Sequence, residues 1–116
     1  MPTITIKRPE IEERPLEGGF ARFEPDPRYA VVLHNDDINT FDFVIKVLQK
    51  VFGYGALKAS WLTMKAHCAG RSAVWTGHLE VAELRAEQIV SCGPDPTRID
   101  HGARPLRVTI EPLMEN

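Results

Sequence analysis

The sequence lacks several features that would mark a membrane, secreted or nucleic-acid-binding protein. Its 116 residues contain no apolar run near the ~20 residues that a membrane-spanning helix needs. The N-terminus lacks the charged and then apolar pattern of a signal peptide. The formal net charge of -2 lacks the basic excess of nucleic-acid-binding proteins. We therefore expect a cytoplasmic protein that binds neither nucleic acid nor membranes.

Cysteine is also scarce, and this limits the covalent chemistry of the chain. Cys68 and Cys92 do not make a disulfide framework, and we interpret both as small buried apolar side chains. Cys68 directly follows His67, and neighbouring positions of a helix diverge by about 100°, which disfavours a Cys-His nucleophile pair. No Gly-rich phosphate loop and no recognisable nucleophile turn is present. We therefore do not expect an enzyme.

Metal binding is disfavoured because no motif of metal ligands is present. The side chains that could serve as ligands lack the close His and Cys spacing of zinc sites. The candidate ligands are His34, Asp36, His67, His78 and His101. We interpret His78 and His101 as exposed loop histidines, and we expect no metal and no cofactor.

The N-terminal part differs in composition from the rest. Residues 1–27 hold five of the nine prolines, the pair Gly18-Gly19 and charges of both signs. Such a segment has too little apolar surface to offset the entropy lost on ordering. We expect residues 1–27 to form a disordered or extended tail, in which residues 3–6 are a candidate short strand, and residues 28–112 to form one domain.

The hydrophobic pattern of the domain predicts alternating strands and helices. Strands are expected at residues 29–34, 72–76 and 106–111, and helices at residues 57–69 and 79–92. A further helix is expected to begin after Asn39 as its N-cap and to end at Gly53. The order β-α-α-β-α-β predicts an α+β fold, with a small three-stranded antiparallel sheet covered on one face by three helices. The loop of residues 93–104 is long for a connection in so small a domain.

The first expected strand ends in a cluster of hydrogen-bond acceptors. Asn35, Asp36 and Asp37 follow it directly and favour a turn. If His67 of the second helix faces this turn, a neutral imidazole joins an amide oxygen and carboxylates. Such a set suits a primary ammonium group, which carries three donors and one positive charge. A solvated turn is the alternative interpretation of these residues taken alone.

Several segments, in this order and spacing, resemble the ClpS family. The segments are His34-Asn35-Asp36-Asp37, Val47-Leu48-Gln49-Lys50-Val51-Phe52-Gly53, Ala66-His67-Cys68-Ala69-Gly70, Glu80-Val81-Ala82-Glu83 and Arg104-Pro105-Leu106-Arg107-Val108-Thr109-Ile110-Glu111. The resemblance covers about residues 29–111 and implies the same β-α-α-β-α-β fold. ClpS proteins are adaptors that bind destabilising N-terminal residues, or N-degrons, and deliver the substrates to AAA+ Clp unfoldases for proteolysis. The resemblance therefore implies an adaptor domain at residues 28–112 and no catalytic residues.

The resemblance also assigns roles to individual positions. Asn35, Asp36 and His67 match the residues that hold the substrate's α-amino group, and Asp37 supports the same turn. A second set matches the positions around the pocket for the first side chain: Asn39, Phe41, Val44, Thr63, Ala66 and Leu106.

The resemblance implies partners as well. Glu80 and Arg85 match a charged surface that docks the N-terminal domain of the unfoldase, and we expect a monomer. The family often has Thr, Met and Met at the positions of Asn39, Phe41 and Thr63, so its first-residue preference is not carried over. The alternative is a regulatory domain that docks the unfoldase without recognising degrons.

Overall fold

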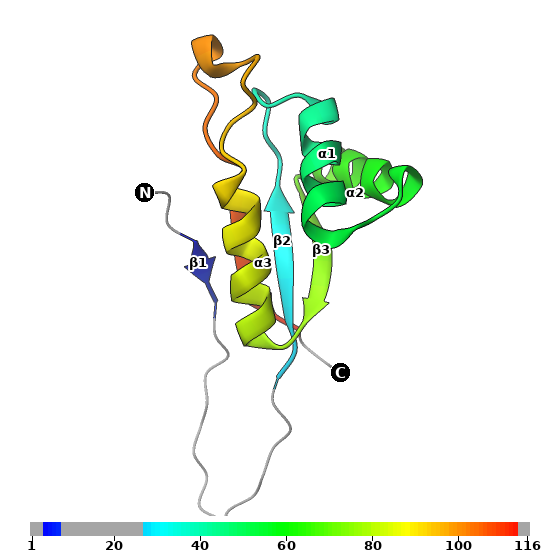
Figure 1. Ribbon diagram of the computed structural model, residues 1–116. Helices are drawn as coiled ribbons and strands as arrows, with labels where there is room; N and C mark the ends of the chain where they lie inside the picture. The colour runs from blue at the N-terminus through cyan, green and yellow to red at the C-terminus, as the bar shows by residue number, and fades with distance from the viewer. Residues whose placement is uncertain (1–3, 8–26, 114–116) are drawn as a thin grey trace, which may run out of the picture.

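The computed structural model describes residues 4–7 and 27–113, and four strands form its sheet. They are β1 (Thr5–Ile6), β2 (Tyr29–His34), β3 (Arg71–Gly77) and β4 (Val108–Pro112), in the order β1-β4-β2-β3 (Figure 1). β2 lies in the centre and pairs antiparallel with both β3 and β4. The predicted α+β fold and the antiparallel pairing of the three expected strands are therefore confirmed.

The N-terminal strand is the one addition to the predicted sheet. β1 pairs parallel with β4, and Thr5 lies opposite Thr109. The candidate strand within residues 3–6 is thus present at Thr5–Ile6, inside the segment that we assigned to the tail. The remainder of that tail, apart from residues 4–7 and 27, lies outside the described residues.

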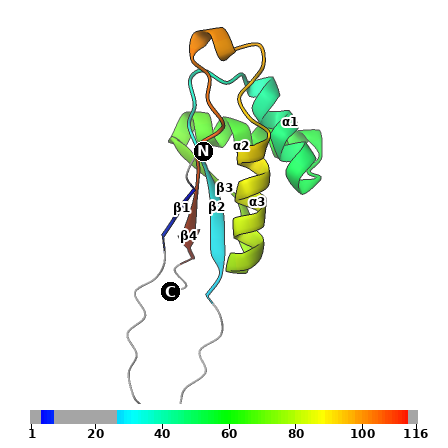
Figure 2. The ribbon, with the colours of Figure 1, turned by 60° about the vertical axis from the view of Figure 1, so that its left-hand side comes forward.

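Three α-helices pack against the sheet, as expected. They are α1 (Phe41–Phe52), α2 (Ala56–Ala69) and α3 (Leu79–Ser91). Figure 2 shows α1 and α3 on the same side of the sheet, and α2 packs against α1 and β3. A 3₁₀ helix, η1 (Ile99–His101), lies in the loop that we predicted to be long.

The predicted N-cap of α1 was wrong by one residue. Thr40 is the N-cap, with an extended backbone, and its hydroxyl accepts a hydrogen bond from the backbone N–H of Phe43. Asn39 does not cap the helix because its side-chain amide binds three other segments of the chain. Helix capping needs only a free side-chain oxygen next to the first turn, and Thr40 supplies it.

The core lies between β2, β4 and the helices. Its fully buried side chains come from each layer and include Val31, Leu33, Leu48, Ile89 and Ile110. α1 and α3 each bury one stripe, as their periodicity predicted.

α2 buries mainly small residues and leaves its largest apolar side chains exposed. Its buried face is made of Ala59, Leu62, Thr63 and Ala66, which face α1 and β3. Leu57, Trp61 and Met64 lie on the other side and are 89%, 62% and 47% exposed.

The interpretation of the cysteines as buried was therefore wrong for one of them. Cys68 continues the exposed line of α2 and is exposed, whereas Cys92 is partly buried. The reason is that small side chains let α2 approach its neighbours closely on the opposite face.

Two backbone hydrogen bonds bring the end of β2 to the neighbouring segments. The N–H of Asn35 donates to the carbonyl of Gly70 at 3.0 Å, which joins the acceptor turn to the end of α2. The N–H of His34 donates to the carbonyl of Arg107 at 3.0 Å, just before β4. The turn, the C-terminal end of α2 and the segment leading into β4 therefore meet at one end of the sheet. Within the described residues, no helix is both long and apolar enough to span a bilayer.

We predict that Leu48→Ala lowers the free energy of unfolding by about 2–5 kcal/mol, because a buried side chain leaves a cavity. Leu57→Ala is the matched control, since Leu57 is 89% exposed, and it should change stability by less than about 0.5 kcal/mol. Urea unfolding of both variants measures the two values. Equal losses would contradict the assignment of the buried face.

Candidate functional site

A hollow opens where the end of β2 meets α1 and α2. Leu33 and His34 line this hollow. So does every residue that we predicted for the amino-group site and for the side-chain pocket: Asn35, Asp36, Asn39, Phe41, Val44, Thr63, Ala66, His67 and Leu106. It contains about 280 Å³ of space between atoms, including its open mouth. Much of this space is open to solvent, so the hollow is an open surface site rather than an enclosed cavity.

Asp36 fixes the turn that brings the acceptors together. Its Oδ1 accepts hydrogen bonds from the backbone N–H groups of Ile38, at 2.8 Å, and Asn39, at 2.9 Å. Its Oδ2 accepts from Nδ2 of Asn39 at 2.6 Å. Each carboxylate oxygen has two lone pairs, so acceptor capacity remains for a ligand. The carboxylate can therefore shape the turn and still bind a cation.

Asn35 and Asp37 complete the turn. Nδ2 of Asn35 donates to Oδ1 of Asp37 at 3.3 Å, and this leaves the amide oxygen of Asn35 as an available acceptor. Asp37 supports the turn in this way and does not line the first hollow.

His67 and Phe41 form one wall. Their ring centroids are 5.0 Å apart, with the rings at 76°, so the two rings meet edge to face. Phe41 is 39% exposed and thus lies partly open to solvent beside the hollow. The bulky ring of Phe41 therefore contacts the imidazole directly.

Thr63 is buried among the apolar residues of the same hollow. Its hydroxyl donates to the carbonyl of Ala59, one turn earlier in α2, at 2.8 Å. A hydroxyl satisfied by its own helix needs no partner from a ligand. Thr63 is therefore compatible with an apolar guest.

His34, which the sequence analysis left outside the pocket set, lines the hollow as a neutral ring. Its Nε2 lies 2.8 Å from Oγ1 of Thr109. Burial, with the guanidinium groups of Arg107 and Arg71, lowers the pKa of His34. A neutral imidazole here does not repel a cationic ligand.

Asn39 connects the turn to the loop of residues 93–104. It is buried, with 4% of its surface exposed. Its Oδ1 accepts from the backbone N–H of Asp95 at 2.8 Å, and its Nδ2 donates to the carbonyl of Arg104 at 2.8 Å as well as to Asp36. Both ends of the long loop are therefore attached to the site.

Asp95 belongs to the same network, although it was not among the residues predicted for the site. Its carboxylate accepts from the hydroxyl and N–H of Thr40 and from the hydroxyl and N–H of Thr97. These hydrogen bonds hold the pKa of the Asp95 carboxyl well below its usual range, and the one from the Thr40 hydroxyl has the largest effect. The spacing of Asp95 and Thr97 is typical of a local turn, but it gives no sign of the contact with Thr40.

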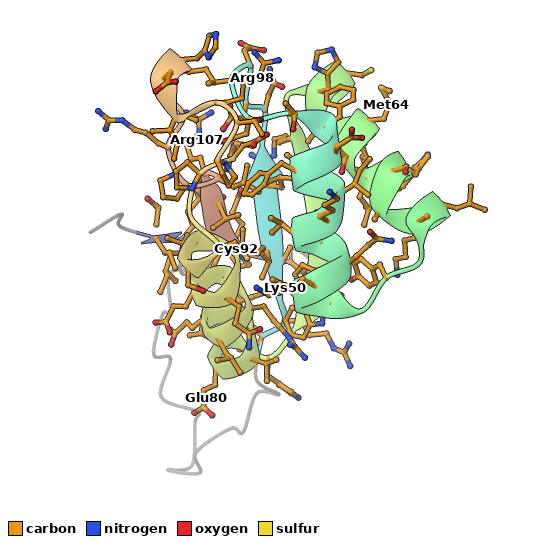
Figure 3. All side chains as sticks on the ribbon, turned by 45° about the horizontal axis from the view of Figure 1, so that its top comes forward. Lys50, Met64, Glu80, Cys92, Arg98 and Arg107 are labelled. Carbon is orange, nitrogen blue, oxygen red and sulfur yellow. The ribbon has the colours of Figure 1, made fainter. Side chains whose placement is uncertain are left out.

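The two residues predicted to dock an unfoldase lie on α3, away from the hollow. Glu80 is exposed in the first turn of α3, at the end of the molecule opposite Arg98 (Figure 3). Arg85 is partly buried, and its Nη1 donates to the carbonyl of Val51 and to Oε1 of Gln88, both at 3.1 Å. Arg85 therefore also joins α3 to the end of α1.

The described residues offer no metal site. No three His, Cys, Asp or Glu side chains in residues 4–7 and 27–113 lie close enough together to hold an ion.

Comparison with known proteins gives one consistent result. Residues 24–109 match the family model described as ATP-dependent Clp protease adaptor protein ClpS. A ClpS adapter protein of Xylella fastidiosa (strain M12) is 40% identical over 74 residues, 64% of this chain and 70% of that protein. One of Desulforapulum autotrophicum is 33% identical over 86 residues, 74% of this chain and 83% of that protein.

A solved structure of a ClpS protein is also similar to this chain. Agrobacterium tumefaciens ClpS2 bound to L-phenylalaninamide superposes with a TM-score of 0.66 at 29% sequence identity. The match covers 77% of this chain and 100% of that chain.

We predict that Asp95→Asn destabilises the protein at pH 7. A carboxyl whose pKa is lowered on folding stabilises the folded state above its unfolded pKa of ~3.9, and this contribution is lost as the pH falls through the folded pKa. The stability difference between the variant and the native chain should therefore shrink below about pH 4. Urea unfolding at pH 7 and pH 3 measures it.

Asp100→Asn is the control, because Asp100 is exposed on the same loop and should change stability by less than about 0.5 kcal/mol. A stability loss for Asp95→Asn that stays constant with pH would contradict the lowered pKa.

Proposed function

The chain belongs to the ClpS family of ATP-dependent Clp protease adaptor proteins, and on this basis we propose that it binds the N-terminal residue of substrate proteins and delivers them to a Clp unfoldase. The observation that supports the proposal is one hollow lined by Asn35, Asp36 and His67 together with apolar side chains such as those of Val44, Ala66 and Leu106. Within this function the protein presents a substrate and does no chemistry on it.

The acceptor set fits a free α-amino group. An ammonium has three N–H donors, and the hollow offers the amide oxygen of Asn35, the carboxylate of Asp36 and the imidazole of His67. Hydrogen bonds to charged groups are roughly twice as strong as neutral ones. An internal backbone amide offers one N–H and no charge, so this acceptor set favours the α-amino group of a chain end over the backbone of an internal segment.

The interior fits one apolar side chain. Val44, Ala66 and Leu106 line it without offering a charge, and the hydroxyl of Thr63 is satisfied within α2. The ligand of the related ClpS2, L-phenylalaninamide, combines a free α-amino group with a benzyl side chain. This supports a hydrophobic first residue, with Phe41 and Thr63 adjusting the shape of the pocket.

A separate surface serves the unfoldase in this proposal. Glu80 is exposed on α3 and is available to the N-terminal domain of a Clp unfoldase. Arg85 supports that surface from its partly buried position by fixing α3 to α1. The monomeric state, the cytoplasmic location and the extent of the adaptor domain, residues 28–112, stay predictions.

We predict that a short peptide beginning with Phe binds and that its N-acetylated form does not, because acetylation removes the positive charge and the donors. Isothermal titration calorimetry with the two peptides measures the difference. A peptide beginning with Asp is a further control for the apolar interior. Equal affinity for the free and acetylated peptides would refute the amino-group site.

We predict that Asp36→Ala weakens binding of the Phe peptide by about 2–5 kcal/mol, the usual cost of removing one partner of a buried charge pair. Asp37→Ala is the matched control, since it removes the same charge from the same turn and Asp37 does not line the hollow. Because Asp36 also fixes the turn, thermal unfolding of both variants is measured in parallel. Equal effects of the two substitutions on affinity would count against direct contact.

A further inference from the structure

The long loop of residues 93–104 forms one side of a second hollow that adjoins the first. The two hollows share Asp36, Asn39, Phe41 and His67, and the second is completed by Arg98 and His101 from the loop. It holds about 1,020 Å³ of space between atoms, including its open mouth, against about 280 Å³ in the first. The second hollow therefore has room for more than one residue.

The backbone of the loop is held in place around Arg98. The N–H of Arg98 donates to the carbonyl of Asp95 at 3.0 Å, and its carbonyl accepts from His101 at 2.9 Å and from Ala103 at 3.1 Å. The loop is in turn attached to the site through Asn39, as described above. The position of Arg98 relative to the acceptor turn is therefore set by the fold, while its side chain is exposed (Figure 3).

The guanidinium of Arg98 is available for a ligand. No described residue forms a hydrogen bond or an ion pair with its side chain. The two carboxylates of the second hollow, Asp36 and Asp37, already accept hydrogen bonds within the turn. A planar guanidinium matches a carboxylate with paired donors. The loop thus adds a cationic side chain beside a site that otherwise attracts cations.

We propose that the residues after the first one of a bound substrate pass through the second hollow, and that Arg98 favours an acidic side chain at the second or third of them. Successive Cα atoms are about 3.8 Å apart, so a chain whose first side chain fills the first hollow crosses the shared wall of Phe41 and His67 within one or two residues. This inference rests on the proposed function and adds a preference beyond the first residue.

Calorimetry with peptides that share a Phe at residue one tests the proposal. The peptides differ only in carrying Glu, Gln or Lys at residue two, and a second set places the same residues at position three. In one of the sets we expect Glu to bind about two- to five-fold more tightly than Gln, as for an exposed ion pair, and Lys more weakly than Gln. The preference should decrease when 0.5 M salt is added, because exposed charges are screened.

Two arginine variants separate a contact from a general charge effect. Arg98→Gln should remove the preference for Glu over Gln. Arg107→Gln removes the same charge at the same end of the sheet but lines neither hollow, so it should retain the preference (Figure 3).

The outcomes of this experiment and of the acetylation experiment are distinguishable. Discrimination against the acetylated peptide with equal affinity for Glu, Gln and Lys in both sets would overturn the role of Arg98 alone. An equal loss of preference in both arginine variants would also overturn it. Loss of discrimination against the acetylated peptide would overturn the amino-group site and this inference together.

Discussion

The site depends on the side-chain amide of Asn39. This one buried group donates to Asp36 and to the carbonyl of Arg104, and it accepts from the N–H of Asp95. The acceptor turn and both ends of the long loop are therefore positioned by the same planar group. A buried amide stabilises the fold only when its donors and acceptors are satisfied, so the three contacts depend on one another. Asn39 lines the pocket, but its larger role is to define the pocket's geometry.

Much of the fold follows from local patterns in the sequence. A continuous apolar run located β2, alternation located β4, and 3.6-residue periodicity located the stripes of α1 and α3. β4, α1 and α3 bury one face against the core, whereas β2 is buried along nearly its whole length. α2 was harder to interpret, since its exposed line carries Leu57, Trp61 and Met64 and its buried face carries two alanines. Apolar character does not distinguish the two faces when close packing favours small residues.

Part of the site could likewise be predicted from local sequence, and part could not. Asn35, Asp36 and Asp37 are adjacent in the chain, so their turn could be predicted from residue types alone. The residues alone left open whether His67 faces this turn, the family resemblance implied that it does, and His67 lines the same hollow in the structure. Asp95, Arg98 and His101 belong to a loop whose conformation is set by contacts with Asn39 and Thr40, far away in sequence. No periodicity or motif encodes such contacts, so their place beside the site became apparent only in three dimensions.

The pairing of β1 with β4 changes how the N-terminal segment is connected to the domain. Because β1 and β2 both lie in the sheet, the chain between them is tethered at two points rather than one. β1 has only two residues, and the hydrogen bond from the N–H of Lys7 to the carbonyl of Ile110 continues its pairing with β4. The N-terminal segment is therefore held to the sheet by few hydrogen bonds. Mechanical force applied to the first residues of the chain would load this attachment before it reached the central strand. Because β1 lines neither hollow, such a force would detach the N-terminal strand while the pairing of β2 with β3 and β4 stayed intact.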